Sequence, residues 1–408
     1  MDEMSVRRGM AYDKSKDEII GFQDDGNNRI NKLATSAFCV MAVGIVNKWK
    51  FPLGYYFTAS VMKCSDIIKV IKDSINVMEG QGFNILGFTT DQGSNLERTF
   101  KLLGATETNP RITIEGRQYY VMRDAPHLLK SARNFLQSRP VNIPGYINPA
   151  RWSDVNQVYM NDLQRSHKLA YKIGERHLSK LRFGTKMKVS LAANVLSNSV
   201  AAAIDVMVAT GDMPTASLAT STFVKKMNDL FDCFNSITFK DNCPLRKPLR
   251  MNSKTTDFLN ETYVWLSKLE EVNSHRRPRF IKGWIMNIKA VIGISEYLAE
   301  RNVKFLFTRN LCQDPLELHF SKIRLLSKFP DCYSFAKNYA RIAAGSLIRA
   351  PTTANCDSTD DHSEDHLTET IGLIMSVSNK LILLIQKLRL LLVCYFYLFL
   401  TQFPIIML

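Results

Sequence analysis

The alternation of apolar and polar residues predicts an α/β organisation at the start of the chain. Apolar runs at 33–46 and 52–58 are rich in β-branched and aromatic residues, as buried strands are. Between 65 and 78, four isoleucines recur at helical spacing, which predicts a helix. A third apolar run, at 84–89, predicts a buried strand that delivers Asp91 at its carboxyl end.

The following segments continue this pattern. A short helix is predicted at 95–103, and residues 111–122 have the form of a β-hairpin around a Glu-Gly turn. Pro126 then opens a helix that reaches about residue 136, because proline is tolerated in a first helical turn. This order of elements is compatible with a ribonuclease-H-like α/β core, provided that one more strand precedes Leu33.

The middle of the chain differs from the α/β pattern of its start, because apolar residues recur there at helical spacing and rarely alternate as in a strand. The predicted helices are 155–181, 186–209, 220–234 and 255–271. We therefore expect an all-α insertion at 141–302 between two α/β pieces, 1–140 and 303–350. The basic residues between 165 and 188 form either a solvated helix face or a binding face.

The C-terminal part contains two predicted helices, 311–326 and 333–348. The composition of the residues after them is no longer that of a folded α/β domain. Residues 351–379 form an acidic, polar linker with little to bury, and 380–408 form a hydrophobic tail. The segment 390–408 has no charged residue and approaches the about 20 residues of a membrane span. A membrane anchor, a buried core helix and an abnormal chain end are the three interpretations of this tail.

Charge and cysteine content narrow the choice of function. The 53 Lys and Arg residues outnumber the 38 Asp and Glu residues, which gives a net charge of +15 and favours a polyanionic partner. The eight cysteines form no closely spaced pair, so no zinc module is visible and a reducing compartment is expected. The signatures of zinc proteases, serine hydrolases and P-loop enzymes are missing from the sequence.

Several carboxylates stand where a metal-dependent active site could use them. Asp91 follows a buried strand, and Asp314 and Glu317 are three residues apart on one face of a predicted helix. Each also has a structural interpretation: Asp91 as a turn residue, Asp314 as a helix N-cap and Glu317 as a partner of the helix dipole. His127, at a helix start, is expected to be structural.

Short strings in chain order carry a resemblance to a known family. The chain resembles the catalytic region of P-element transposases and of their domesticated relatives, the THAP-domain transposase-like proteins. The resemblance runs from Asp2 to about Arg324. Its strings are DEMS from residue 2, KDEIIGF from 16, LAT from 33, DQGSN from 91, PHLLK from 126, FDCFNS from 231 and QDPLE from 313.

The resemblance implies a ribonuclease-H-like domain split by an α-helical insertion that binds GTP. Asp2, Asp91 and Glu317 match the family's catalytic carboxylates, with Asp314 as a further candidate, and would hold two Mg²⁺ ions. The implied activity is GTP-assisted cleavage and transfer of DNA strands in the nucleus. Transposon-end DNA and a second copy of the chain are the implied partners, and no GTP-contacting residue can be assigned.

The sequence also departs from the family's pattern. The zinc-coordinating THAP domain and its coiled coil have no counterpart in these 408 residues, and the matching region begins with Asp2 itself. We therefore expect a truncated first strand and a core that is inactive as it stands. The alternatives are a domesticated, non-enzymatic DNA- or nucleotide-binding protein and a protein anchored to a membrane through 390–408.

Overall fold

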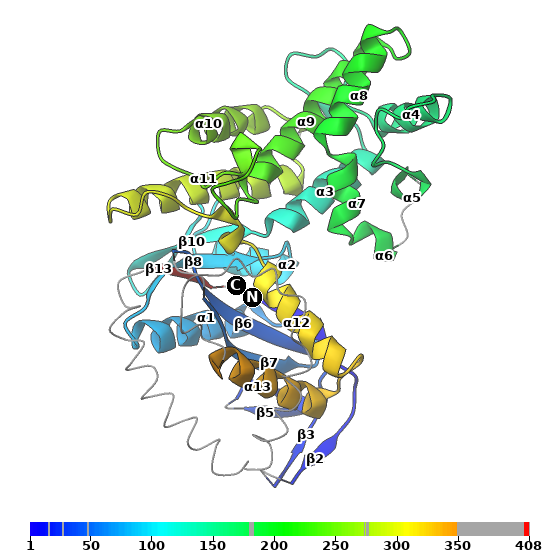
Figure 1. Cartoon of the computed structure of the whole chain (residues 1–408). Helices are drawn as coiled ribbons and strands as arrows, with labels where there is room; N and C mark the ends of the chain where they lie inside the picture. The colour runs from blue at the N-terminus through cyan, green and yellow to red at the C-terminus, as the bar shows by residue number, and fades with distance from the viewer. Residues whose placement is uncertain are drawn as a thin grey trace. The chain divides into compact units, whose positions relative to one another are not determined.

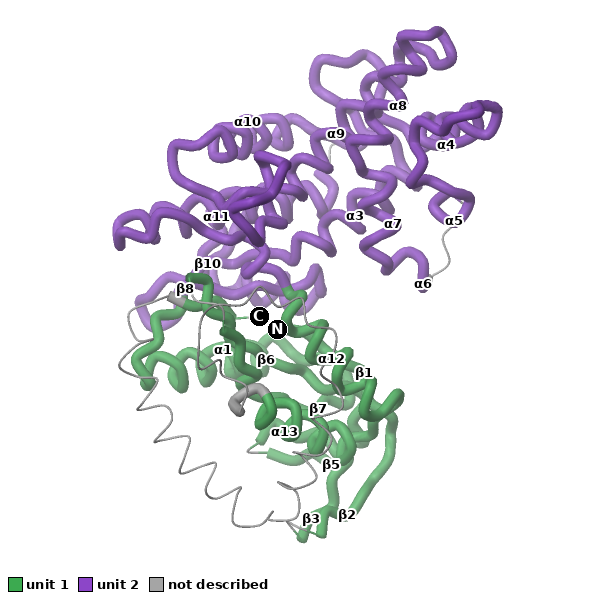
Figure 2. The backbone as a smooth tube through the Cα atoms, viewed as in Figure 1, with its two compact units in different colours: residues 1–85, 313–408 green, residues 86–312 purple. Residues whose placement is uncertain are grey.

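The computed structural model describes residues 1–348, with short gaps at 15–16, 27, 47–48, 179–182, 273 and 275–276, together with 404–407. The chain forms two compact units, which Figure 2 shows in different colours. Unit 1 contains residues 1–85 and 313–408, and unit 2 contains residues 86–312. The domain limits expected from the sequence, at 140 and 302, stay a prediction. The linker at 351–379 lies outside the described residues.

Unit 1 is built on an antiparallel sheet whose centre is strand β6. Strand β6 (Ser36–Gly44) pairs along its length with β7 (Lys50–Thr58), and β4 (Phe22–Asp24) and β5 (Arg29–Leu33) extend the sheet beyond β7. Every residue of β6 after Ser36 is buried. The strands predicted at 33–46 and 52–58 are therefore confirmed, with small shifts of their ends.

The other edge of β6 carries two short strands from opposite ends of the sequence. Strand β1 (Asp2–Ser5) pairs antiparallel with the first part of β6, and β13 (Pro404–Met407) pairs antiparallel with its last part. Strand β1 is the strand that the sequence required before Leu33. A separate hairpin, β2 (Ala11–Asp13) with β3 (Glu18–Ile20), was not predicted.

Within its described residues, unit 1 also contains the helices α1 (Cys64–Glu79), α12 (Asp314–Leu326) and α13 (Cys332–Ile348), which Figure 1 labels. All three were predicted. Helix α13 packs on β7 through aromatic rings, because Phe335 and Tyr339 lie edge-on to Tyr55 with centroid distances of 5.4 and 4.8 Å. Such edge-to-face pairs add stabilisation beyond their buried area.

Unit 2 contains the strands β8, β10 and β9, which are neighbours in that order. Strand β8 (Asn84–Thr90), whose first two residues fall in unit 1, runs parallel to β10 (Arg117–Arg123). Strand β9 (Arg111–Ile114) pairs antiparallel with β10, and the helix α2 (Ser94–Leu102) follows β8. The predicted strand, short helix and hairpin are all present.

The hairpin turn between β9 and β10 needs a left-handed backbone at both central residues. Glu115 has φ = 51° and Gly116 has φ = 81°. We expect Gly116→Ala to lower the free energy of unfolding by about 1 kcal/mol, because a Cβ atom is strained at this φ although the space around it is open. Urea denaturation measures the change, and Gly184→Ala, which has open space and no positive φ, is the control. Equal effects of the two substitutions would contradict this explanation of the turn.

The rest of unit 2 is helical. Its helices are α3 (Ala125–Ser138), α4 (Trp152–Leu163), α5 (Glu175–Leu178), α6 (Phe183–Lys186), α7 (Val189–Val195), α8 (Asn198–Ala209), α9 (Leu218–Cys233), α10 (Lys254–Ser267) and α11 (Arg279–Ala299). Short elements are β11 (Val141–Asn142), β12 (Glu270–Glu271), η1 (Thr215–Ser217), η2 (Pro244–Arg246) and η3 (Thr308–Leu311).

The sequence expectations for the helical region differ from the structure in several details. The helix expected at 155–181 ends at Leu163, where the buried Asp162 carboxylate accepts hydrogen bonds from the N–H groups of Leu169 and Ala170 and stabilises a loop. The helix expected at 186–209 is interrupted between α7 and α8. Helix α11, the longest helix in the described part of unit 2, was missed.

Within the described residues, the helical stretch Val189–Ala209 is long and apolar enough to cross a membrane, and 56% of its apolar window is buried inside the protein. Of the tail at 380–408, the structure describes only Pro404–Met407, and this segment is a strand. The remainder of the tail lies outside the described residues.

Candidate active site

Asp91 stands at the carboxyl end of β8, where the strand gives way to α2. Its Oδ1 atom accepts a hydrogen bond of 2.9 Å from the backbone N–H of Gly93, so the side chain shapes the turn. A Cβ atom at Gly93 would lie 2.9 Å from the same oxygen, which explains why glycine follows here. Asp91 is half-buried. The turn therefore fixes one carboxylate oxygen and orients the whole group.

A second carboxylate lies at the same edge of the sheet. Because β8 and β10 run parallel, the residues that follow them are neighbours, and the N–H of Asp124 donates to the carbonyl of Thr90 over 2.9 Å. Asp124 is 1% exposed and caps α3 by accepting a hydrogen bond from the N–H of His127. The His127 ring Nδ1 lies 3.8 Å from Asp124 Oδ2. This carboxylate–imidazole pair was not predicted.

Arg123 connects the two strand ends. Its Nη1 donates to Thr90 Oγ1 over 3.0 Å and to the carbonyl of Asp91 over 3.1 Å, and its guanidinium lies 5.5 Å from the centroid of the Phe100 ring. Burial lowers the pKa of Arg123, but arginine keeps its charge at neutral pH. A buried cation thus fixes the backbone of Asp91.

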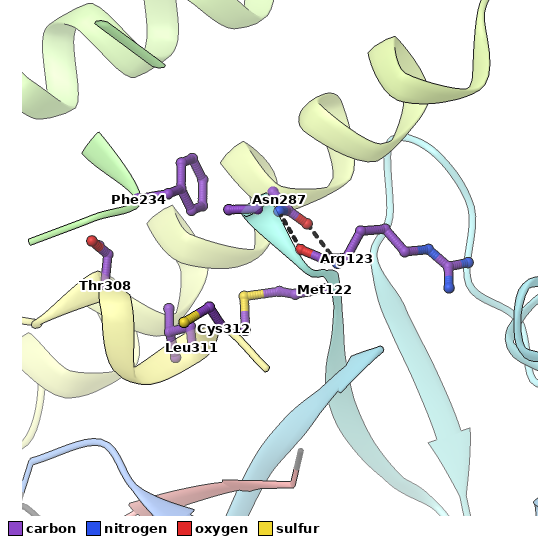
Figure 3. A pocket seen from close by; sticks show the side chains of 8 residues that line it. Met122, Arg123, Phe234, Asn287, Thr308, Leu311 and Cys312 are labelled. Atoms are coloured by element: carbon purple, nitrogen blue, oxygen red, sulfur yellow. Dashed lines mark hydrogen bonds between the residues drawn. The ribbon is translucent and has the colours of Figure 1, made fainter. Parts of the chain in front are cut away.

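Helix α11 holds the end of β10 through one amide side chain. Asn287, 1% exposed, accepts a 2.7 Å hydrogen bond from the N–H of Arg123 and donates one of 2.7 Å to its carbonyl, as the dashed lines in Figure 3 show. The two bonds satisfy both backbone polar groups of Arg123. The helical part of unit 2 therefore positions the strand that carries Arg123.

We expect Asn287→Leu to lower the free energy of unfolding by about 2–4 kcal/mol, because it leaves a buried N–H and a buried C=O without partners. Denaturation followed by circular dichroism measures the loss. Ser295→Ala on the same helix is the matched control, since that hydroxyl bonds only within the helix, to Val291. Equal stability of the Leu variant and the wild type would refute this account of the Asn287 side chain.

Unit 1 holds the other predicted site residues. Asp2 begins β1, and the neighbouring Met1 carbonyl accepts a 2.7 Å hydrogen bond from the side-chain amide of Gln313, which is fully buried. Gln313 is also the N-cap residue of α12, so this helix starts beside Asp2. Asp314 is the first residue of α12, and its interpretation as the N-cap is wrong by one position. Glu317 follows one turn later.

His319, which follows the carboxylates Asp314 and Glu317 on α12, adds no positive charge beside them. Burial lowers the pKa of His319 to about 4, with smaller contributions from Lys322 and Lys50, so the ring is neutral at pH 7. It is 5% exposed and lies edge-on to Tyr339 at 5.0 Å. His319 is therefore a packing residue, and the carboxylates at the start of α12 face no imidazolium from it.

The site residues fall in both units. Unit 1 brings Asp2 and the start of α12, with Asp314 and Glu317, to one place, and unit 2 brings Asp91, Asp124 and His127 to one sheet edge. Carboxylate oxygens are the ligands that Mg²⁺ prefers, so the donor chemistry in each unit fits a divalent ion. Asp124 could have been suspected from the sequence, because it lies two residues after the predicted hairpin at 111–122.

The pocket lined by residues of β10, α11 and η3 is not a nucleotide site. The pocket shown in Figure 3 lies between β10, α11 and η3 and is lined by Met122, Asn287, Thr308 and Leu311 among others. Its volume of about 10 Å³ is the size of a single water molecule. It is therefore far too small for GTP.

Comparison with known proteins agrees with this architecture. The chain resembles the Drosophila P element transposase strand transfer complex with a TM-score of 0.73 and 23% identity, over 86% of this chain and 76% of that chain. The fold is thus that of a ribonuclease-H-like domain interrupted by a helical insertion. The family models for the TNP-like RNase H N-terminal domain and the TNP-like GTP-binding insertion domain match residues 1–104 and 126–248. The chain belongs to this P-element transposase-like family, as the sequence predicted.

Two curated relatives extend the comparison. The chain is 25% identical over 333 residues to the Transposable element P transposase of Drosophila melanogaster, which is 79% of this chain and 41% of that protein. It is 26% identical over 372 residues to the DNA transposase THAP9 of Homo sapiens, which is 82% of this chain and 39% of that protein. The chain therefore spans about two fifths of the relatives it matches.

Proposed function

We propose that this chain is the core of a P-element-type DNA transposase, in which Asp2, Asp91 and Glu317 bind divalent metal ions. The observation that carries the proposal is the placement of Asp91. It directly follows a buried strand inside the region that matches the TNP-like RNase H domain, and a buried arginine and an Asx turn orient it. Such rigid support is what a metal site requires of its ligands.

The other ligands are assigned from the family's motifs and supported by their local structure. Asp2 lies on a strand paired with the buried β6, and Glu317 lies on a helix whose N-cap bonds to Met1. Asp314, one turn before Glu317, is a further candidate. Two ions bound by these groups would activate a water or a DNA 3′-hydroxyl and stabilise the leaving oxygen. The carboxylates anchor the ions, and Arg123 holds the backbone of Asp91 in place.

The proposed core has three partners. GTP binds the insertion, supported by the match of residues 126–248 to the GTP-binding insertion model. DNA binds through a surface whose affinity falls with salt, in keeping with the net charge of +15. A nuclear location follows from the DNA substrate. We further propose that a second copy of the chain assembles with it on transposon-end DNA.

The test uses the full chain with transposon-end DNA and separates binding from catalysis. Mn²⁺ binding is measured by calorimetry, GTP binding by fluorescence of a labelled analogue with ATP as competitor, and strand cleavage with Mg²⁺ or Mn²⁺ against Ca²⁺ as the non-supporting ion. We expect saturable Mn²⁺ binding, selectivity for GTP and metal-dependent cleavage that Glu317→Gln abolishes.

The outcomes separate the hypotheses that the sequence left open. Metal and DNA binding with no cleavage under any ion would favour the domesticated, non-enzymatic binder. Absence of saturable metal binding in the folded wild-type chain would overturn the proposed site itself. Vesicle binding without DNA binding would support the membrane-anchored alternative.

A further inference from the structure

The loop between β8 and α2 contains three residues, and a different contact holds each of them. The Asp91 carbonyl accepts a hydrogen bond from Arg123 on β10, and the Gly93 N–H donates one to the Asp91 carboxylate. Gln92, between these two residues, is held from α3, because the Ser131 hydroxyl donates a hydrogen bond of 2.5 Å to Gln92 Oε1. The side chain of Gln92 therefore ties the loop of Asp91 to a residue 39 positions later in the sequence.

Helix α3 is a firm support for this contact. At its N-terminus, Asp124 caps the first turn, and the Asp124 N–H donates to the Thr90 carbonyl on β8. Further along the helix, Leu128 packs so closely on α11 that a Cβ atom at Gly283 would collide with the Leu128 side chain. The helix also packs on α4, α7 and α9. A side chain of α3 can therefore hold a neighbouring loop in a fixed place.

The hydrogen bond between Ser131 and Gln92 joins two regions that match different family models. Gln92 lies next to Asp91 in the RNase H region, 1–104, whereas Ser131 lies in the GTP-binding insertion, 126–248. Both side chains are half-buried. Because water can replace each partner when such a neutral bond breaks, the bond contributes little to the stability of the fold. Its main effect is to restrict the movement of the loop.

We propose that Gln92 and Ser131 are positioning residues for Asp91, so that the first helix of the insertion supports the metal site directly. Contacts that orient a metal ligand contribute about 10–100-fold to metal affinity, because the ion needs its ligands in a fixed geometry. Arg123 holds the Asp91 backbone from β10, and the Gln92–Ser131 bond holds the following residue from α3. With support from both elements, the Asp91 carboxylate keeps one orientation. The inference rests on the proposed role of Asp91 as a ligand.

The first test measures Mn²⁺ affinity by calorimetric titration of the full chain. Ser131→Ala is expected to weaken binding by about 10-fold. The matched control is Ser138→Ala on the same helix, whose hydroxyl bonds to the carbonyls of Asn134 and Phe135 within α3, and it should leave the affinity unchanged. Ser131→Thr keeps a hydroxyl and is expected to restore most of the affinity. Wild-type affinity in Ser131→Ala, or equal losses in both alanine variants, would overturn the inference.

A double substitution tests whether the two residues act through one bond. Gln92→Ala alone is expected to weaken Mn²⁺ binding about as much as Ser131→Ala. The double variant should lose no more affinity than either single variant, because both substitutions remove the same interaction. Losses that multiply in the double variant would contradict the shared bond.

Hydrogen–deuterium exchange without metal gives a readout that does not depend on ion binding. The Gly93 N–H is bonded to the Asp91 carboxylate, so a peptide covering 91–97 reports opening of the loop. We expect it to exchange about 5-fold faster in Ser131→Ala and at the wild-type rate in Ser138→Ala. Unchanged exchange in Ser131→Ala would refute the positioning role. Faster exchange together with no Mn²⁺ binding in the wild type would support the positioning of Asp91 and overturn its role as a ligand.

Discussion

Replacing Asp91 by Asn is expected to weaken Mn²⁺ binding to the full chain by about 100-fold or more, because even groups that only orient a metal ligand contribute 10–100-fold. The substitution is nearly isosteric. The Asn side-chain oxygen can still accept the hydrogen bond from Gly93 N–H, so the turn before α2 is preserved. The free energy of unfolding without metal should therefore stay within about 0.5 kcal/mol of the wild type. Calorimetric titration with Mn²⁺ measures the affinity.

The control for this substitution is Asp205→Asn, which removes a charge from an exposed position on α8 in the same unit. It is expected to leave Mn²⁺ affinity unchanged. Equal affinity in the wild type and Asp91→Asn would contradict the assignment of Asp91 as a ligand. Equal losses in Asp91→Asn and Asp205→Asn would mean that net charge alone attracts the ion.

Replacing Trp284 by Ala is expected to lower the free energy of unfolding by about 3–5 kcal/mol, the usual loss for a fully buried large aromatic side chain. Trp284 is fully buried on α11, with its ring 5.4 Å from that of Phe234 at the end of α9. Its removal leaves a cavity where these helices meet. Chemical denaturation followed by far-ultraviolet circular dichroism measures the change.

Trp284→Phe is the matched control. Among the described residues, the indole N–H of Trp284 has no hydrogen-bond partner, so phenylalanine loses volume without leaving a polar group unsatisfied. Its effect should be less than half that of the alanine variant. A loss below about 1 kcal/mol for Trp284→Ala would show that the site collapses around the smaller side chain and that α11 does not organise the unit as described.

The sequence was most informative where local rules decide the structure. The hairpin at 111–122, the helix opened by Pro126 and the strand at 84–89 depend on turn chemistry, proline geometry and short apolar runs, and all are present. The ribonuclease-H-like class and the family also followed, because motifs in a fixed order carry information that single spacings lack. The local elements are consequences of contacts close in sequence.

Helix α11 was missed for a physical reason. More than half of its residues are buried, including Ile281, Trp284, Ile288 and Val291, so apolar side chains surround much of the helix. Hydrophobic periodicity predicts a helix only when one face is apolar and the other is polar. The difference between the two faces of α11 is small. A segment of this kind is identified by its packing against Arg123 and Leu128, which no sequence window contains.

The site could be predicted only in part. Asp91 was found because it follows a strand, but the role of Arg123 and Asn287 in orienting it depends on residues 164 positions apart. The structure of the C-terminal tail could not be predicted for the same reason, since it depends on contacts between residues far apart in the sequence. An apolar run has the same composition whether lipid or protein buries it, and the pairing of β13 with β6 joins residues at opposite ends of the chain.

The arrangement of unit 1 also sets the order in which the protein can fold during synthesis. Its sheet comes largely from residues 1–85, yet α12, α13 and β13 come from residues after 312. At about 5–20 residues per second, the ribosome needs roughly 10–45 s to make the 86–312 segment between them. During this time unit 2 can fold. The strands β6 and β7 meanwhile lack α13 and β13, which contact them in the finished protein. The nascent chain is thus a natural substrate for chaperones that hold exposed sheets until translation ends.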